Sequence, residues 1–183
     1  MSRTIAFAAL IALALTTTAT VPAAQSARDT AEHGPHGAND ASLAARVREA
    51  TADFRDINQA VAAGYARFGG CVSGPEVGAM GVHYVNNALV DGTLDVTRPE
   101  ALIYEYRNGT ARLVGVEFIT PAPVWDAQST DVPVLAGQHL QFVGAPNRYR
   151  LPGLYELHVW AWRDNPNGTY VDWNPKVSCD GEE

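Results

Sequence analysis

Apolar residues between positions 43 and 65 recur at spacings of four and three, with charged residues between them. This spacing places the apolar side chains on one face of an α-helix. The stripe consists of Leu43, Val47, Ala50, Phe54, Ile57, Val61 and Tyr65. Asn39 or Asp40 can cap the start of the helix, and Gly69-Gly70 can end it. The pattern predicts one long amphipathic helix that buries one face against another element.

After Cys71 the chain consists of short apolar runs separated by turn residues, which is typical of antiparallel β structure. Asn108-Gly109 is a dipeptide that strongly favours a two-residue hairpin turn. A second hairpin turn is predicted at Asn165-Pro166-Asn167-Gly168. The expected hairpin strands are 101–107 with 110–119, and 154–163 with 169–173.

A regular two-residue turn fixes which side chains of the first hairpin face each other. Glu105 then lies opposite Arg112, and the two form a charge pair across the strands. Glu117 then falls on the same face as Tyr104 and Leu113. Apolar residues also line the opposite face near Glu117, so we expect both faces of this strand to be buried.

A long helix followed by an antiparallel meander predicts an α+β fold, in which the helix packs on a curved antiparallel sheet shaped as a roll or cone. If the sheet closes on itself, the alternative is a small cupin-like β-barrel with an N-terminal helix. Residues 40–183 have the length of one domain with one core, so a single α+β domain is expected there.

The start of the chain is typical of a targeting segment. Met1-Ser2-Arg3 is positive, and the apolar run at 5–15 that follows is too short to span a bilayer. We interpret 1–26 as a cleaved signal peptide and 27–39, which has no apolar periodicity, as a mobile leader. The protein is therefore expected to be secreted, to the extracellular space or the cell envelope, without membrane insertion.

Acidic residues outnumber basic ones, with 20 Asp and Glu against 13 Lys and Arg and a net charge of −7 at pH 7. The sequence contains no basic block that could neutralise phosphates, which argues against nucleic acid and anionic membranes as partners. The expected partner is a small molecule or a metal ion, and no protein partner is indicated.

Cys71 and Cys179 are the two cysteines of the chain. Because export places them in an oxidising compartment, we predict a disulfide bond between them. Two free thiols that bind a metal are the weaker alternative, since no CxxC pairing is present.

Glu117 is a carboxylate inside the apolar stretch 112–119. A buried carboxylate needs a cation, a strong donor or its own proton, because burying an unpaired charge costs several kcal/mol or more. His83 and His158 lie in similar apolar stretches of two other expected strands and are its favoured partners. The three residues predict a polar site in an apolar pocket.

Two imidazoles and one carboxylate form a ligand set that suits divalent zinc, copper, iron or manganese. The candidate metal ligands are His83, Glu117 and His158. The candidate ligand-binding residues beside them are Tyr84, Tyr104 and Trp160. The predicted function is thus a secreted, disulfide-closed domain that binds a small ligand or a metal ion in a pocket lined by His and Glu.

Other interpretations of the same residues remain open. Without a metal, the three could transfer protons in an apolar cavity. Backbone carbonyls could instead satisfy the histidines while Glu117 pairs with Arg148 or Arg150. Glu156 and Tyr84 are candidates to support a metal-bound histidine, and His139 is a further, lower-ranked candidate for the site.

Trp160, Trp162 and Trp173 gather on the second expected hairpin. Aromatic side chains on adjacent strands usually pack against each other. The alternative function is a non-catalytic interaction or carbohydrate-binding module that uses this Trp-rich hairpin.

The sequence lacks the Gly-x-Ser-x-Gly elbow of serine hydrolases, a Gly-rich phosphate loop, the HExxH motif and an EF-hand. These absences leave the protein without an assigned reaction class.

Three motifs carry a resemblance to a known group of proteins. They are Gly78-Ala79-Met80-Gly81-Val82-His83-Tyr84-Val85-Asn86, the run from Leu157-His158-Val159-Trp160 to Asn165-Pro166-Asn167-Gly168, and Trp173-Asn174-Pro175-Lys176-Val177-Ser178-Cys179. The chain resembles, over most of its mature length, a family of uncharacterised exported bacterial proteins. The resemblance implies a secreted bacterial product, and it implies neither an activity nor a catalytic residue.

Overall fold

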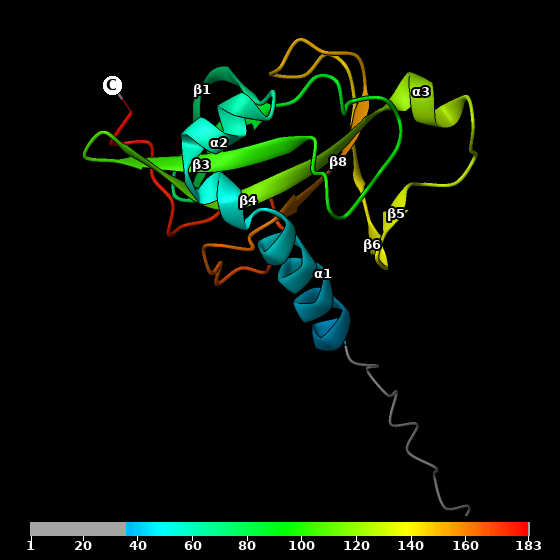
Figure 1. The fold of residues 1–183 in the computed structure, drawn as a ribbon. Coiled ribbons are helices and arrows are strands. Elements are labelled where there is room, and N and C mark those ends of the chain that lie inside the picture. Colours follow the sequence, from blue (N-terminus) through cyan, green and yellow to red (C-terminus); the bar gives the residue numbers. More distant parts are fainter. Residues whose placement is uncertain (1–35, 183) are drawn as a thin grey trace, which may run out of the picture. The chain divides into compact units, whose positions relative to one another are not determined.

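The computed structural model describes residues 36–182 of the chain (Figure 1). The predicted signal peptide at 1–26 and most of the predicted leader at 27–39 therefore lie outside the described residues. The helical part begins at His36. Its elements are α1 (His36–Ala50), the 3₁₀ helix η1 (Ala52–Arg55) and α2 (Ile57–Ala62).

The predicted long helix is therefore interrupted, and the interruption falls at Thr51. The Thr51 hydroxyl donates a hydrogen bond to the Val47 carbonyl oxygen at 2.7 Å and accepts one from the Trp162 indole at 3.0 Å. Asp56 then caps α2 by accepting a hydrogen bond from the Asn58 backbone N–H at 2.9 Å. The apolar stripe stays buried at its start, whereas Val61 is 55% exposed.

Six strands form one antiparallel sheet with the order β1-β2-β3-β4-β8-β7. The strands are β1 (Ala66–Gly74), β2 (Gly78–Val85), β3 (Ala101–Arg107), β4 (Thr110–Pro121), β7 (Gln141–Val143) and β8 (Leu154–Val159). A short helix α3 (Ala122–Asp126) and a small two-stranded sheet, β5 (Val134–Leu135) with β6 (Gln138–His139), connect β4 to β7. Gly69-Gly70, which the sequence placed at a helix end, lies within β1.

The predicted α+β class with a curved antiparallel sheet is confirmed. The sheet is open, because β1 and β7 are its two edges and do not pair with each other in the described part of the chain. It therefore has the form of half a barrel and not of the closed cupin-like alternative.

The Asn108-Gly109 hairpin is confirmed near its turn, where Arg107 pairs with Thr110 and Glu105 with Arg112. Beyond the pair of Tyr104 and Leu113 the register shifts, so that Ile103 pairs with Gly115 instead of Val114. Val114 is thus the extra residue of a β-bulge.

The bulge reverses the predicted face of Glu117. Glu117 pairs with Ala101 and shares a face with Ile103, whereas Tyr104 and Leu113 lie on the other face. Both faces are buried here, as predicted, since Val116 is 0% and Glu117 is 3% exposed.

The predicted charge pair of Glu105 with Arg112 is also wrong, although the two residues lie opposite each other. Glu105 binds the Arg107 side chain at 2.9 Å and accepts a hydrogen bond from the Ser178 backbone N–H at 3.1 Å. The C-terminal segment covers this face and buries Glu105, so the carboxylate takes the nearest donors.

The second predicted hairpin does not form as a strand pair. β8 ends at Val159 and pairs with β4 and β7, and residues 169–173 contain no strand. Asn165 holds the following segment as a loop: its side chain accepts from the Asn167 N–H at 3.1 Å and donates to the Trp173 carbonyl at 3.0 Å.

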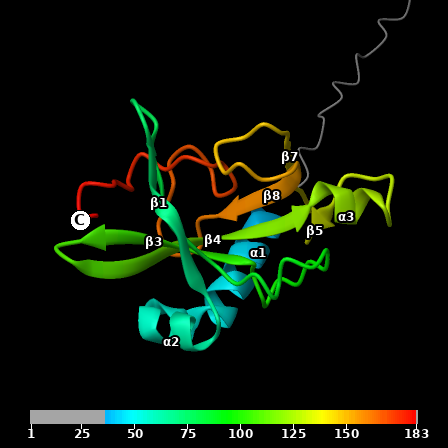
Figure 2. The same cartoon turned by 90° about the horizontal axis from the view of Figure 1, so that it is seen from above.

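The two faces of the sheet are covered by different parts of the chain (Figure 2). Helices α1 and α2 lie on one side of β3 and β4, and the C-terminal segment lies on the other. The Cys71–Cys179 disulfide bond is present as predicted and joins β1 to the C-terminal segment across 108 residues of sequence.

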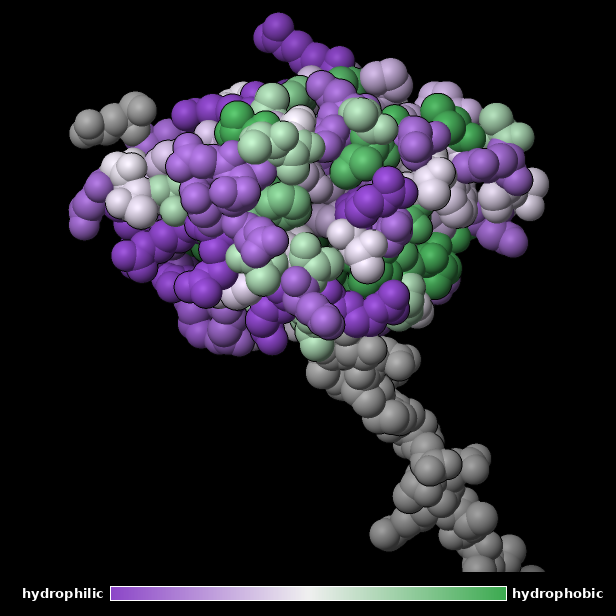
Figure 3. Space-filling model, viewed as in Figure 1, coloured by the Kyte–Doolittle hydropathy of each residue, from purple (hydrophilic) through white to green (hydrophobic). Residues whose placement is uncertain are grey.

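The surface viewed in Figure 3 is a mosaic of hydrophilic residues with smaller groups of hydrophobic ones. None of the helices within residues 36–182 is both long and apolar enough to cross a membrane.

Candidate metal centre

The register of the sheet brings His83, Glu117 and His158 to one face. His158 on β8 lies directly opposite Glu117 on β4. His83 on β2 lies opposite Ile103, which is on the same face as Glu117. Because directly opposed residues of antiparallel strands point to the same side, all three side chains point away from the helices.

The three side chains converge. His83 Nε2 lies 3.2 Å from Glu117 Oε2 and 3.4 Å from His158 Nε2. The residues are 4%, 3% and 0% exposed for His83, Glu117 and His158. The predicted cluster is therefore present, with its atoms all within 4.8 Å of one another.

These separations fit a bound metal ion. Two ligand atoms that each lie about 2.0–2.1 Å from a tetrahedral zinc ion are about 3.3–3.4 Å apart. The separations of 3.2 and 3.4 Å from His83 Nε2 are close to that value, and the remaining pair of atoms lies within 4.8 Å. The cluster is therefore close to the spacing that a bound ion requires.

The charges of the cluster are set by its members. Burial alone raises the pKa of the Glu117 carboxyl, but the imidazoles of His158 and His83 outweigh it and lower the pKa to about 2. Burial alone lowers the pKa of His158, but Glu117 and Asp172 outweigh it and raise the pKa to about 9. Glu117 is thus the anion of the cluster at neutral pH.

Glu156 is a second buried carboxyl beside the cluster. Burial and the neighbouring Glu117 carboxylate raise its pKa to about 8, so it holds a proton at neutral pH. Its Oε1 accepts a hydrogen bond from Gln141 at 3.1 Å, while no donor among the described residues reaches its Oε2. Glu156 was predicted to support a histidine, whereas its closest electrostatic partner is Glu117.

Asp172 is the carboxylate nearest the second nitrogen of His158. Its Oδ1 lies 3.5 Å from His158 Nδ1, which forms no hydrogen bond of normal geometry among the described residues. Burial alone raises the pKa of Asp172, and His158 together with Gln141 lowers it below its usual value. Gln141 also donates a hydrogen bond to Asp172 Oδ1 at 2.6 Å, which fixes the carboxylate beside the ring.

Asp172 was not among the predicted site residues. Its signal is the same as that of Glu117, an acid between apolar and aromatic neighbours, here Val171 and Trp173.

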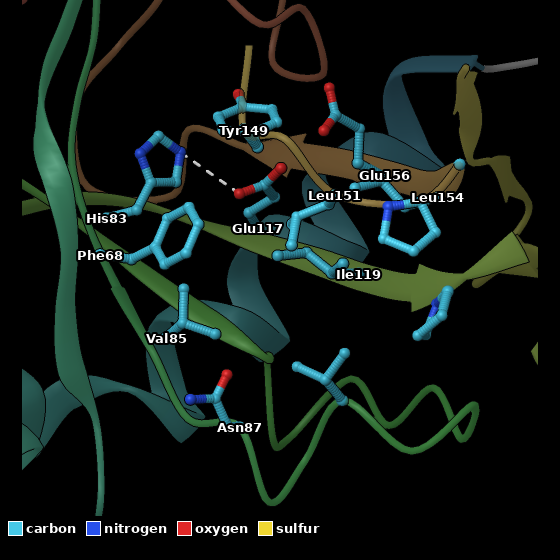
Figure 4. Close-up of a pocket in the computed structure, with 14 residues that line it drawn as sticks. Phe68, His83, Val85, Asn87, Glu117, Ile119, Tyr149, Leu151, Leu154 and Glu156 are labelled. Carbon is cyan, nitrogen blue, oxygen red and sulfur yellow. Dashed lines mark ion pairs between the residues drawn. The ribbon is translucent and has the colours of Figure 1, made fainter. Parts of the chain in front are cut away.

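A cavity of about 270 Å³ opens beside the cluster (Figure 4). His83, Glu117 and Glu156 reach it, and His158 lies behind them, fully buried. Most of the remaining wall is apolar and comes from Phe68, Val85, Val90, Ile119, Pro121, Leu151, Pro152 and Leu154. An ion held by the cluster would therefore face a largely apolar chamber.

The three candidate ligand-binding aromatics lie elsewhere. Tyr84 and Tyr104 belong to the core under the helices, where Tyr104 donates a hydrogen bond to the Phe54 carbonyl oxygen at 2.6 Å. Trp160 is buried on the cluster's side of the sheet, with its ring stacked 6.2 Å from that of His158. None of them lines the cavity.

The other candidate residues are also accounted for. His139 is exposed in β6, away from the cluster. Arg148 lies over the Trp173 ring at 5.0 Å, and Arg150 is exposed. Glu117 is therefore held by imidazoles and not by an arginine.

No family model, curated protein or solved structure matches the chain. Function is therefore inferred from the residues of the cluster and of the cavity.

Proposed function

We propose that the protein binds one divalent transition-metal ion through His83 Nε2, His158 Nε2 and Glu117 Oε2. The observation that carries this proposal is the convergence of the three atoms, at 3.2 and 3.4 Å, in a buried site with one side toward a cavity. Three protein ligands with an open position are typical of metal sites that act on a bound molecule.

The donor set favours zinc, iron(II), manganese or copper(II), because imidazole and carboxylate suit these ions. A divalent ion would replace the proton that His158 holds near neutral pH.

Asp172 and Gln141 support this site from behind. A carboxylate near the distal nitrogen of a metal-bound histidine orients the ring and makes it a better ligand. With 3.5 Å between His158 Nδ1 and Asp172 Oδ1, a small rotation completes this contact. We expect Asp172→Asn to weaken zinc binding by about 10- to 100-fold and to leave the stoichiometry at one.

The test is zinc binding by calorimetry on chelator-treated protein, with metal content measured by mass spectrometry. We expect wild type to bind one zinc per chain, and His83→Ala and Glu117→Gln to lower the affinity by more than about 100-fold. His139→Ala is the matched control, since that histidine is exposed and outside the cluster.

Circular dichroism verifies that each variant is folded. Equal zinc affinity in wild type, His83→Ala and Glu117→Gln would show that the cluster is not the binding site. A His139→Ala variant that loses zinc as strongly as His83→Ala would show the same.

We also propose that the protein works after export, as the predicted signal at 1–26 and the family resemblance imply. The Cys71–Cys179 disulfide supports this, since such bonds persist in oxidising compartments. Mass spectrometry of the protein from culture medium and envelope tests it, and a mature chain that starts near residue 27 is expected.

A further inference from the structure

The ionisable side chains that line the cavity lie together at one of its ends. In Figure 4, His83, Glu117, Glu156 and Tyr149 lie together, while Val85 and Asn87 lie away from them. The wall between consists mainly of hydrocarbon side chains. A molecule that fills this space must therefore have an apolar body and polar atoms at one end.

The charge of the metal-bound site determines which polar group of a ligand fits at this end of the cavity. Two neutral imidazoles and the Glu117 carboxylate offset only one of the two positive charges of a divalent ion. None of the residues that line the cavity is Lys, Arg or Asp. An anionic oxygen at the open position of the ion is therefore favoured over a neutral one, because a buried charge that its ligands leave uncompensated is costly.

Tyr149 supplies a hydrogen-bond donor at the same end. Among the described residues, the Tyr149 hydroxyl donates its hydrogen bond to the Met80 sulfur, at 3.8 Å. A thioether is a weak acceptor, so the hydroxyl gains by donating to a negatively charged oxygen.

We infer that the cavity binds a small organic anion of the carboxylate class, with a hydrocarbon body between the apolar walls. Its oxygen head completes the coordination of the metal ion and accepts a hydrogen bond from Tyr149. This inference rests on the proposed metal site.

The test uses octanoate as the probe, titrated by calorimetry into zinc-loaded and zinc-free protein. We expect octanoate to bind the zinc-loaded protein at least about tenfold more tightly than the zinc-free protein, and more tightly than 1-octanol, which has the same body without the charge. From butanoate to octanoate the affinity should rise by up to about fourfold per methylene group.

Two pairs of variants distinguish the contribution of the ligand's hydrocarbon body to binding from that of its carboxylate head. Leu151→Trp narrows the cavity from an exposed loop position, and we expect it to weaken octanoate binding at least about tenfold. Its control is Val61→Trp, at an exposed position on α2. Tyr149→Phe should weaken octanoate about two- to tenfold, whereas Tyr155→Phe, whose hydroxyl binds Asp126, should leave it unchanged.

Zinc binding is measured first on every variant, so that the two proposals fail separately. If zinc does not bind at the cluster, the proposed function fails and this inference falls with it. If zinc binds but butanoate and octanoate bind equally, or 1-octanol binds as tightly as octanoate, or Leu151→Trp has no effect on octanoate binding, the metal site stands and the inferred ligand class is wrong.

Discussion

At the scale of single residues, three buried carboxyl groups are kept in two different states by their neighbours. Imidazoles hold Glu117 ionised, with a pKa of about 2. Burial keeps Glu100 and Glu156 protonated at neutral pH, with pKa values of about 8 each. The sequence identified Glu117 because an acid in a buried strand needs a partner, and the partner proved to be a histidine, as predicted.

Glu100 gives a prediction about pH. The pKa of the Glu100 carboxyl is about 8 in the folded protein and 4.5 ordinarily. Between pH 4.5 and pH 8 this carboxyl is therefore ionised in the unfolded chain and protonated in the folded one. The unfolded state then binds fewer protons, and the stability of the metal-free protein falls as pH rises from about 4.5 through 8. Glu100→Gln should lose less stability over this pH range than wild type does. Between pH 5 and pH 8, the free energy of unfolding of the variant should rise relative to that of wild type by on the order of 2 kcal/mol.

Urea unfolding of metal-free protein across pH 4–9 measures this effect. The Gln side chain can still accept the hydrogen bond that the Ile119 N–H donates to Glu100 at 2.9 Å. Glu49→Gln, at an exposed helix position, is the control and should follow wild type. A pH profile of Glu100→Gln parallel to that of wild type would contradict the assignment.

At the scale of elements, β4 is positioned by its bulge and by Gly115. Beyond Val114, Gly115 packs so closely on β8 that an added Cβ would lie 2.9 Å from the Val159 carbonyl oxygen and 3.3 Å from the Trp160 ring. This close approach sets the distance between the strands that carry Glu117 and His158.

We expect Gly115→Ala to destabilise the fold by about 1–3 kcal/mol, because backbone and an aromatic ring must both shift. It should also weaken zinc binding, since β8 moves relative to β4. Gly144→Ala is the control, because its added Cβ meets only the Phe142 ring at an ordinary 3.5 Å. Chemical denaturation and zinc titration measure both effects, and similar results for the two variants would rule out this role of Gly115.

The sequence could predict features that depend on neighbouring residues, but not those that depend on contacts between residues far apart in the chain. Asn108-Gly109 specifies its own turn, so the hairpin was found, together with the pairs next to it. The Val114 carbonyl at the bulge accepts a hydrogen bond from the Trp162 N–H at 3.1 Å, and Thr51 at the helix break accepts one from the Trp162 indole, 111 residues away. A local pattern carries no information about such contacts, and both were missed. The second hairpin was wrong because its turn residues favour a loop equally well.

At the scale of the whole molecule, the chain closes the second face of the sheet with its own C-terminal segment. Ala79, Ile103, Val114, Trp160 and Val177 form a small core there, separate from the core under the helices. The disulfide holds this segment to β1, which also carries the Phe68 wall of the cavity. The bond therefore supports the side of the sheet that bears His83, Glu117 and His158.

Replacing both cysteines, Cys71→Ser with Cys179→Ser, should lower the free energy of unfolding by roughly 2–5 kcal/mol, because the unfolded chain is no longer closed over 108 residues. Urea denaturation of the double variant and of wild type measures the difference. Cys71→Ser alone should lose nearly as much, and an unchanged midpoint in the double variant would contradict the prediction.

Strand β3 contributes no atom to the cluster, yet it lies between the strand of His83 and the strand of Glu117. An ion bound by His83 and Glu117 would lie above Ile103 and link β2 to β4 across β3, which would restrict bending of the sheet at this point. Amide protons of 101–107 should consequently exchange more slowly when zinc is added, although nothing in that strand touches the ion. Hydrogen–deuterium exchange would then detect occupancy of the metal site through slower exchange in the adjacent strand β3.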